Sequence, residues 1–143
     1  MCNVYRVERR FYLVDLPGYG YARLAKRQRT ELRALIASYL ETRRTLAGIV
    51  WLLDIRHPPS RDDAAMADLL IRIARPVLVA LTKADKITRS RRLSRLAALA
   101  EAVGVPPEQC VLTSAVSREG IRMLQDAIGA LAQGHHPPAR VES

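Results

Sequence analysis

Three short stretches that combine acidic, hydroxyl and glycine residues each follow an apolar run of the chain. They are DLPG at 15–18, TKAD at 82–85 and TSA at 113–115. The apolar runs before them have the composition expected of buried strands. Because the carboxyl ends of parallel strands meet at one edge of a sheet, we expect the three stretches to come together there and to form a ligand site.

The stretch TKAD has the residue types that can read a guanine base. A carboxylate such as Asp85, held at a strand end, can accept two parallel hydrogen bonds from the N1–H and the 2-amino group of guanine. Adenine carries an acceptor at the equivalent ring nitrogen and would leave the carboxylate unpaired, a mismatch that can cost roughly 10⁴-fold in affinity. The stem of Lys83 can lie across the base plane.

The TSA loop is expected to complete this base site. Its backbone N–H groups would be offered to the carbonyl oxygen of guanine. The predicted base-binding residues are therefore Thr82, Lys83, Ala84, Asp85, Thr113, Ser114 and Ala115.

The stretch DLPG fits the phosphate and metal end of a nucleotide. Mg²⁺ keeps several of its waters and takes few direct carboxylate ligands, so Asp15 can hold the ion through a water. Gly18 has no Cβ, and its N–H can therefore approach a terminal phosphate. A D-x-x-G pattern alone occurs by chance in many proteins, so its place among the three strand ends carries the prediction. The predicted phosphate-side residues are Asp15, Leu16, Pro17 and Gly18.

Strands alternate with helices along the chain, which predicts a parallel sheet with right-handed crossovers. The runs CNVYRV and FYLVD, separated by ERR, predict a hairpin. Three later runs, AGIVWLLDI, RPVLVALTK and QCVLTSA, predict the strands of the sheet. Together these elements place the polar stretches in loops at strand ends.

Four helices are expected between and after these strands. The first is expected over 25–44, the third over 90–104 and the fourth over 118–132. The second is expected to begin at a capping box formed by Ser60 and Asp63 and to end at about Ile73. Gly104 is the expected stop signal of the third helix. Apolar residues at helical spacing predict the inward faces of the first and third helices, namely Leu32, Leu35, Ile36, Tyr39 and Leu40, and Leu93, Leu96, Leu99 and Ala100.

The charge of the chain favours a polyanionic partner. Its 143 residues carry a formal charge of +9, with a pI near 10.4, which suits RNA. Aromatic residues make up only 5%, so a base-stacking platform for single strands is not indicated. Cys2 and Cys110 form no C-x-x-C pair, and they indicate neither a zinc site nor a disulfide scaffold. The apolar runs are too short to span a membrane, and we expect a cytoplasmic protein.

The motifs together resemble those of one family. DLPGYGYA at 15–22, DIRHPP at 54–59, LTKADK at 81–86 and SREGI at 117–121 are similar to motifs of the ribosome-assembly GTP-binding proteins of the EngB (YihA/YsxC) type. That family lies within the Era-like translation-factor GTPases. The resemblance covers roughly Val4 to Leu131. It implies an α/β fold, the three-layer sandwich of a P-loop NTPase-like, Ras-like G domain.

The resemblance also implies a function and assigns the site residues. It implies binding of GTP or GDP with Mg²⁺, a role in assembly of the large ribosomal subunit through ribosomal RNA, and a link to normal septation in cell division. We expect a monomer. Asp15–Gly18 match the phosphate and metal loop, Thr82–Asp85 the base-specificity loop, and Thr113–Ala115 the loop behind the base. Tyr19 stands where Ras-like enzymes carry a water-orienting Gln, and no residue is identified as catalytic.

The chain departs from the family at the phosphate loop. The motif G-x-x-x-x-G-K-[ST] is absent, since none of the seven glycines is followed by lysine, and no switch-I threonine stands in the 14 residues before Asp15. The resemblance implies that the first, central strand is also missing, between the strands at 11–15 and 47–55. We therefore expect an N-terminally truncated G domain over 1–133 with a disordered tail over 134–143. Alone it should be poorly stable and bind GTP weakly or not at all, so GTP hydrolysis is not expected.

An alternative interpretation is a non-enzymatic module that binds the ribosome or RNA and has lost nucleotide turnover. Asp54 is interpreted as a turn and cap residue rather than a ligand-edge carboxylate. His57 is interpreted as a structural loop residue. Two groups of basic residues either contact ribosomal RNA phosphates or form solvated helix faces: Arg89, Arg91, Arg92 and Arg95, and Lys26, Arg27, Arg29 and Arg33.

Overall fold

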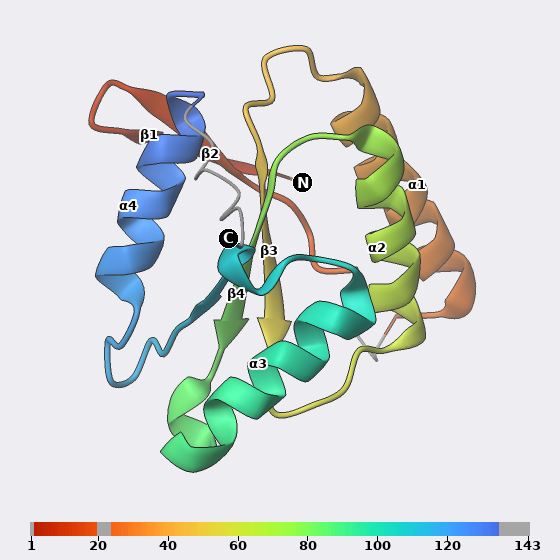
Figure 1. Ribbon diagram of the computed structural model, residues 1–143. Coiled ribbons are helices and arrows are strands. Elements are labelled where there is room, and N and C mark those ends of the chain that lie inside the picture. Colours follow the sequence, from red (N-terminus) through yellow and green to blue (C-terminus); the bar gives the residue numbers. More distant parts are fainter. Residues whose placement is uncertain (1, 20–23, 135–143) are drawn as a thin grey trace, which may run out of the picture. The chain divides into compact units, whose positions relative to one another are not determined.

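The computed structural model describes residues 2–19 and 24–134 (Figure 1). The predicted tail therefore lies outside the described residues except for Gly134, and so do residues 20–22 of the DLPGYGYA motif. The chain divides into two compact units, residues 1–45 and residues 46–143, and each is described by itself.

The first unit opens with the predicted hairpin. Strands β1 (Asn3–Val7) and β2 (Phe11–Asp15) pair antiparallel, with Val7 opposite Phe11 and Asn3 opposite Asp15. The turn is closed by a 2.9 Å hydrogen bond from the Arg10 N–H to the Val7 carbonyl. Glu8 and Arg9 both have positive φ, at 47° and 58°, the backbone that matches the twist of a tight hairpin. The loop that begins at Asp15 thus starts from an ordered strand.

Helix α1 (Lys26–Thr42) follows in the same unit, and its covered face differs from the prediction. Ile36 and Leu40 are buried, and Leu32 and Tyr39 are half-buried. Leu35 is 68% exposed, so its predicted inward position is wrong. The covered face centres on the side of Ile36 and Leu40, and at 100° per residue Leu35 falls well away from it.

The second unit contains a parallel sheet with the strand order β3-β4-β5. Its strands are β3 (Ile49–Asp54), β4 (Val77–Thr82) and β5 (Cys110–Leu112). In the central strand, Val79, Ala80 and Leu81 are fully buried, because helices cover both faces. Helices α2 (Arg61–Ile73) and α3 (Arg89–Val103) lie over one face and α4 (Ile121–Ala132) over the other (Figure 1). This confirms the predicted α/β fold with a parallel sheet.

Strand β3 forms an edge of this sheet. Within the described ranges it pairs with β4 alone, from Ile49 opposite Val77 to Asp54 opposite Thr82. Leu52 on this strand is exposed, although the run around it is apolar. The implied strand between 11–15 and 47–55 remains a prediction.

The helix ends follow their local signals. Ser60 and Asp63 form the predicted capping box, with the Asp63 N–H 3.1 Å from Ser60 Oγ and the Ser60 N–H 2.8 Å from Asp63 Oδ2. Gly104 ends α3 in the left-handed conformation with φ at 73°. Leu93 is 75% exposed, so its predicted inward position is wrong. Arg92 takes the inward place in that first turn, one and two turns before Leu96 and Leu99 on the same face.

None of the helices built from residues 2–19 and 24–134 is long and apolar enough to cross a membrane.

Candidate nucleotide site

The loops after β4 and β5 are joined by backbone hydrogen bonds. The Ala84 N–H donates to the Thr113 carbonyl over 3.0 Å. Thr113 donates twice to the Leu81 carbonyl, from its N–H at 2.8 Å and from its hydroxyl at 3.1 Å. The structure therefore brings Thr82–Asp85 and Thr113–Ala115 together at the carboxyl edge of the sheet, as the sequence predicts.

Asp85 is anchored by a serine of the neighbouring loop. The Ser114 hydroxyl donates a 2.7 Å hydrogen bond to Asp85 Oδ1, and Ser114 is fully buried. The Ser114 side chain also accepts the Ser117 N–H at 3.0 Å, while its own N–H donates to the Glu119 carbonyl at 3.0 Å. A carboxylate offers about four acceptor positions. Asp85 can therefore hold Ser114 and still accept two hydrogen bonds from a planar ligand.

The same contact favours the charged form of Asp85. The Ser114 hydrogen bond is the largest of the causes that hold the pKa of Asp85 below its ordinary value, and the positive charges of Lys86 and Arg92 act in the same direction. An ionised carboxylate accepts but does not donate hydrogen bonds. At neutral pH it suits a ligand edge that carries two adjacent donors.

Lys83 holds an uncommon backbone conformation and reaches back to the end of β3. It has φ at 62°, in the left-handed region, and precedes the short 3₁₀ turn η1 (Ala84–Lys86). Its Nζ lies 3.2 Å from Asp54 Oδ2. A non-glycine residue in this region is strained, which is typical of ligand-clamping loops. The sequence predicts a role for the Lys83 stem but not this partner for its ammonium group.

Asp54 is held by Arg56 two residues later. Its Oδ1 accepts the Arg56 N–H at 3.0 Å, and its Oδ2 lies 2.8 Å from Arg56 Nη2. The Arg56 side chain is the largest cause that holds the pKa of Asp54 well below its ordinary value. The backbone contact confirms the interpretation of Asp54 as a turn residue. The contact between Asp54 and Lys83 could have been expected only from the strand register, which places Asp54 opposite Thr82.

A second ion pair links α3 to the loop after β5. Arg92 Nη1 lies 2.6 Å from Glu119 Oε2, and the arginine side chain is only 12% exposed. Arg92 therefore differs from Arg89 and Arg91, which are exposed on the same helix. Its guanidinium supports the loop that carries Ser114, so Arg92 is too buried to contact RNA as the sequence suggested.

The predicted phosphate-side residues belong to the first unit. Asp15 is exposed at the end of β2, and Leu16 and Pro17 are half-buried. With Gly18 they border a hollow of about 300 Å³. That this loop faces the loops of the second unit remains a prediction.

The residues around Asp15 fit Mg²⁺ only as a partial site. Among the residues that the structure describes, no group of three or more His, Cys, Asp or Glu side chains could hold a metal ion. Mg²⁺ needs only one or two carboxylates when phosphate oxygens and waters complete its shell. The single Asp15 carboxylate is thus compatible with an ion carried by a nucleotide.

Comparison with known proteins identifies the family. The chain is 35% identical over 142 residues to the probable GTP-binding protein EngB of Geobacter sulfurreducens, covering 96% of this chain and 67% of that protein. It belongs to the EngB family. The EngB protein of Syntrophomonas wolfei is 38% identical over 129 residues, with 90% of this chain and 66% of that protein covered. The chain thus spans about two thirds of the length of these EngB relatives. No family model matches it.

Solved structures agree with the fold. The crystal structure of a probable GTP-binding protein EngB superposes with a TM-score of 0.79, at 20% identity, over 93% of this chain and 84% of that chain. The FeoB G-domain from Methanococcus jannaschii superposes with a TM-score of 0.59, at 20% identity, over 92% of this chain and 79% of that chain. This EngB-family chain therefore has the α/β fold of a G domain.

Proposed function

We propose that this EngB-family chain binds guanine nucleotides and that Asp85 reads the base. The observation that carries the proposal is the ionised Asp85 carboxylate, fixed by the 2.7 Å Ser114 hydrogen bond beside the joined loops. Two adjacent acceptor positions match the N1–H and 2-amino donors of guanine and mismatch adenine. The names of the EngB relatives, each a probable GTP-binding protein, agree with this choice of base.

The structure refines the proposed role of the TSA loop. The N–H of Thr113 already donates to Leu81, and that of Ser114 donates to Glu119. We therefore assign the contact with the guanine carbonyl oxygen to the N–H of Ala115. In this proposal the Lys83 stem covers one face of the base, while Thr82 and Ala84 hold the loop through their contacts with Leu53 and Thr113.

We propose that the phosphates are held weakly. Asp15 would hold Mg²⁺ through a water and the Gly18 N–H would approach the terminal phosphate, in keeping with the hollow beside them. Mg²⁺, when bound, neutralises phosphate charge. The chain contains no G-x-x-x-x-G-K-[ST] sequence to cradle the phosphates. Base selectivity without strong affinity is the expected behaviour, and no turnover of GTP is proposed.

We further propose a ribosomal partner, a role in large-subunit assembly and a link to cell division, as the resemblance to the EngB type implies. The net charge of +9 supports a polyanionic partner. Arg89 and Arg91 are exposed and Arg95 is half-exposed on α3, and these residues would contact RNA phosphates. A monomer in the cytoplasm is proposed, in keeping with two free cysteines. Binding to ribosomal RNA that weakens steeply with added salt supports this partner, and salt-independent binding contradicts it.

Nucleotide titration distinguishes the proposed guanine site from the alternative, an RNA-binding module without a nucleotide site. The ¹⁵N-labelled chain is titrated with GMP, AMP and XMP, whose single phosphate minimises the contribution of the missing phosphate loop. We expect GMP to shift the backbone signals of 82–86 and 113–117, and AMP to leave them in place. The Asp85→Asn variant should bind XMP in preference to GMP, because an amide can donate to the carbonyl that xanthine carries in place of the 2-amino group. Equal shifts with GMP and AMP, or no shifts with GMP, contradict the proposal.

A further inference from the structure

We propose that Asp54 is a positioning residue for the base, which holds the ammonium group of Lys83 so that the lysine stem is presented in one conformation. The inference rests on the proposed function of the Thr82–Asp85 loop. It adds a residue from the DIRHPP segment, 29 positions before Lys83, to the residues that determine guanine binding.

The two residues are brought together by the sheet itself. Asp54 is the last residue of β3 and lies opposite Thr82, the last residue of β4. Beyond this pair, the Ile55 N–H donates to the Thr82 carbonyl at 3.1 Å, and the Thr82 hydroxyl donates to the Leu53 carbonyl at 3.3 Å. The 3.2 Å contact between Lys83 Nζ and Asp54 Oδ2 thus spans two strand ends with fixed spacing.

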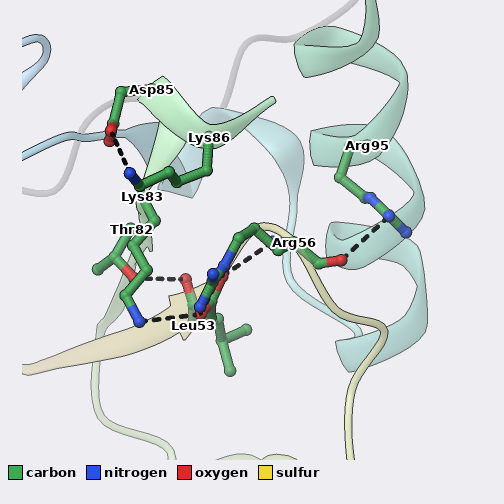
Figure 2. Close-up of polar contacts among 8 residues, drawn as sticks. Leu53, Arg56, Thr82, Lys83, Asp85, Lys86 and Arg95 are labelled. Atoms are coloured by element: carbon green, nitrogen blue, oxygen red, sulfur yellow. Dashed lines mark hydrogen bonds and ion pairs between the residues drawn. The ribbon is translucent and has the colours of Figure 1, made fainter. Parts of the chain in front are cut away.

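The Asp54 carboxylate is more firmly fixed than one of an ordinary surface ion pair. Its Oδ1 accepts the backbone N–H of Arg56 at 3.0 Å, a contact that needs no side-chain ordering. The Arg56 guanidinium adds a bond of 2.8 Å to Oδ2, and the Arg56 carbonyl accepts Arg95 Nη2 at 3.3 Å (Figure 2). Exposed ion pairs between two mobile side chains contribute little. Here one partner is already immobile, so only Lys83 has to be ordered.

Lys83 benefits from such an anchor for two reasons. Its flexible stem loses rotamer freedom when a ligand packs on it, and a stem that is ordered before binding loses less. Asp85, two residues later, is also the nearest competing acceptor along the loop. A lysine released from Asp54 could pair with Asp85 and compete with the two donors of guanine.

If Asp54 positions Lys83, removing the Asp54 carboxylate should weaken GMP binding because Lys83 is no longer held. Asp54→Asn should weaken GMP binding by about threefold to tenfold. Arg56→Gln should leave GMP binding within about twofold, because the backbone N–H still aims the carboxylate and Lys83 keeps its partner. Asp68→Asn, at an exposed position on α2, is the matched control and should change neither affinity nor stability. Both Asp54→Asn and Arg56→Gln should lower the unfolding midpoint, since each breaks the same ion pair.

A double-mutant cycle separates positioning from a merely structural role. Lys83→Met keeps a flexible stem and removes the ammonium group. If Asp54 acts through Lys83, adding Asp54→Asn to Lys83→Met should leave the GMP dissociation constant unchanged while still lowering the unfolding midpoint. An equal loss of affinity in both backgrounds overturns the inference.

The failure of the inference is distinguishable from that of the proposed function. An unmodified chain that binds GMP and an Asp54→Asn variant that binds it equally well overturn the role of Asp54 alone. An unmodified chain whose signals at 82–86 do not move with GMP overturns the guanine site, and the role of Asp54 with it.

Discussion

The hydroxyl of Ser114 donates a 2.7 Å hydrogen bond to the carboxylate of Asp85 and joins the loop after β5 to the loop after β4. The serine is fully buried, and its oxygen also accepts the N–H of Ser117. One side chain thus fixes the carboxylate that is proposed to read the base and shapes the loop that would offer the Ala115 N–H. The two halves of the proposed base site are therefore mechanically coupled.

This coupling predicts the effect of Ser114→Ala. The change removes the acceptor of the Ser117 N–H and should destabilise the chain by about 1–3 kcal/mol. The pKa of Asp85 should rise toward its ordinary value, because its largest stabilising contact is lost. Urea unfolding measures the first effect, and the ¹³C signal of the Asp85 carboxyl group, followed against pH, measures the second. Ser38→Ala, at an exposed position of α1, should change neither, and an unchanged pKa in Ser114→Ala would contradict the assigned contact.

The ion pair of Asp54 predicts a loss of stability in acid. Its pKa in the folded chain lies well below the ordinary value of 3.8. As pH falls below about 4, the unfolded chain takes up a proton that the folded chain does not, so protonation favours unfolding. The contribution of Asp54 is fully present above that pH and is lost as pH falls toward the pKa of the folded state.

Unfolding midpoints of the unmodified chain and of Asp54→Asn, measured from neutral to acid pH, check this prediction. We expect the difference between the two proteins to be constant above about pH 5 and to shrink below about pH 4. A difference that is independent of pH over this range contradicts the assigned pKa direction.

The two cysteines should differ sharply in reactivity. Cys2 is exposed, whereas Cys110 is buried in β5. Burial, with a smaller contribution from the charge of Glu108, raises the pKa of the Cys110 thiol to about 11. Because the thiolate is the reactive form, Cys110 should react with a disulfide reagent only after the chain opens. We expect one fast thiol per chain at neutral pH, and the second at a rate that increases with urea. Two fast thiols in the absence of urea would show that the sheet is open at β5.

Local signals predicted the elements of this fold well. The Ser60–Asp63 capping box and the glycine at 104 mark helix ends through contacts within a few residues, so they can be found in the sequence. The place of TKAD and TSA after apolar runs likewise predicted that the loops meet, because parallel strands leave little choice.

Contacts between distant segments could not be predicted in the same way. The Arg92–Glu119 pair spans 27 positions, and the Lys83–Asp54 pair depends on strand register. Arg92 looks like one more basic residue of a solvated helix, and Leu93 looks like an inward residue. The structure shows the opposite at both positions: Arg92 is nearly buried and paired with Glu119, and Leu93 is exposed.

Gly120 is the position where a single methyl group should damage the site most clearly. Its φ is 71°, and an added Cβ would lie 1.8 Å from the Leu112 carbonyl oxygen. Backbone cannot move aside as a flexible side chain can, so Gly120→Ala must displace either the start of α4 or the end of β5. We expect a destabilisation of at least about 2 kcal/mol, from the clash together with the strain of a positive φ.

The matched control is Gly129→Ala within α4. There an added Cβ meets nothing within 4 Å, and φ is not positive. Alanine is the better helix former, so this variant should be neutral or more stable by about 0.5–1 kcal/mol. Urea unfolding measures both changes. Because β5 leads directly into Thr113–Ala115, Gly120→Ala should also reduce the GMP-induced shifts at 113–117, while Gly129→Ala preserves them. Equal stability of the two variants would contradict the close approach of Gly120 to Leu112.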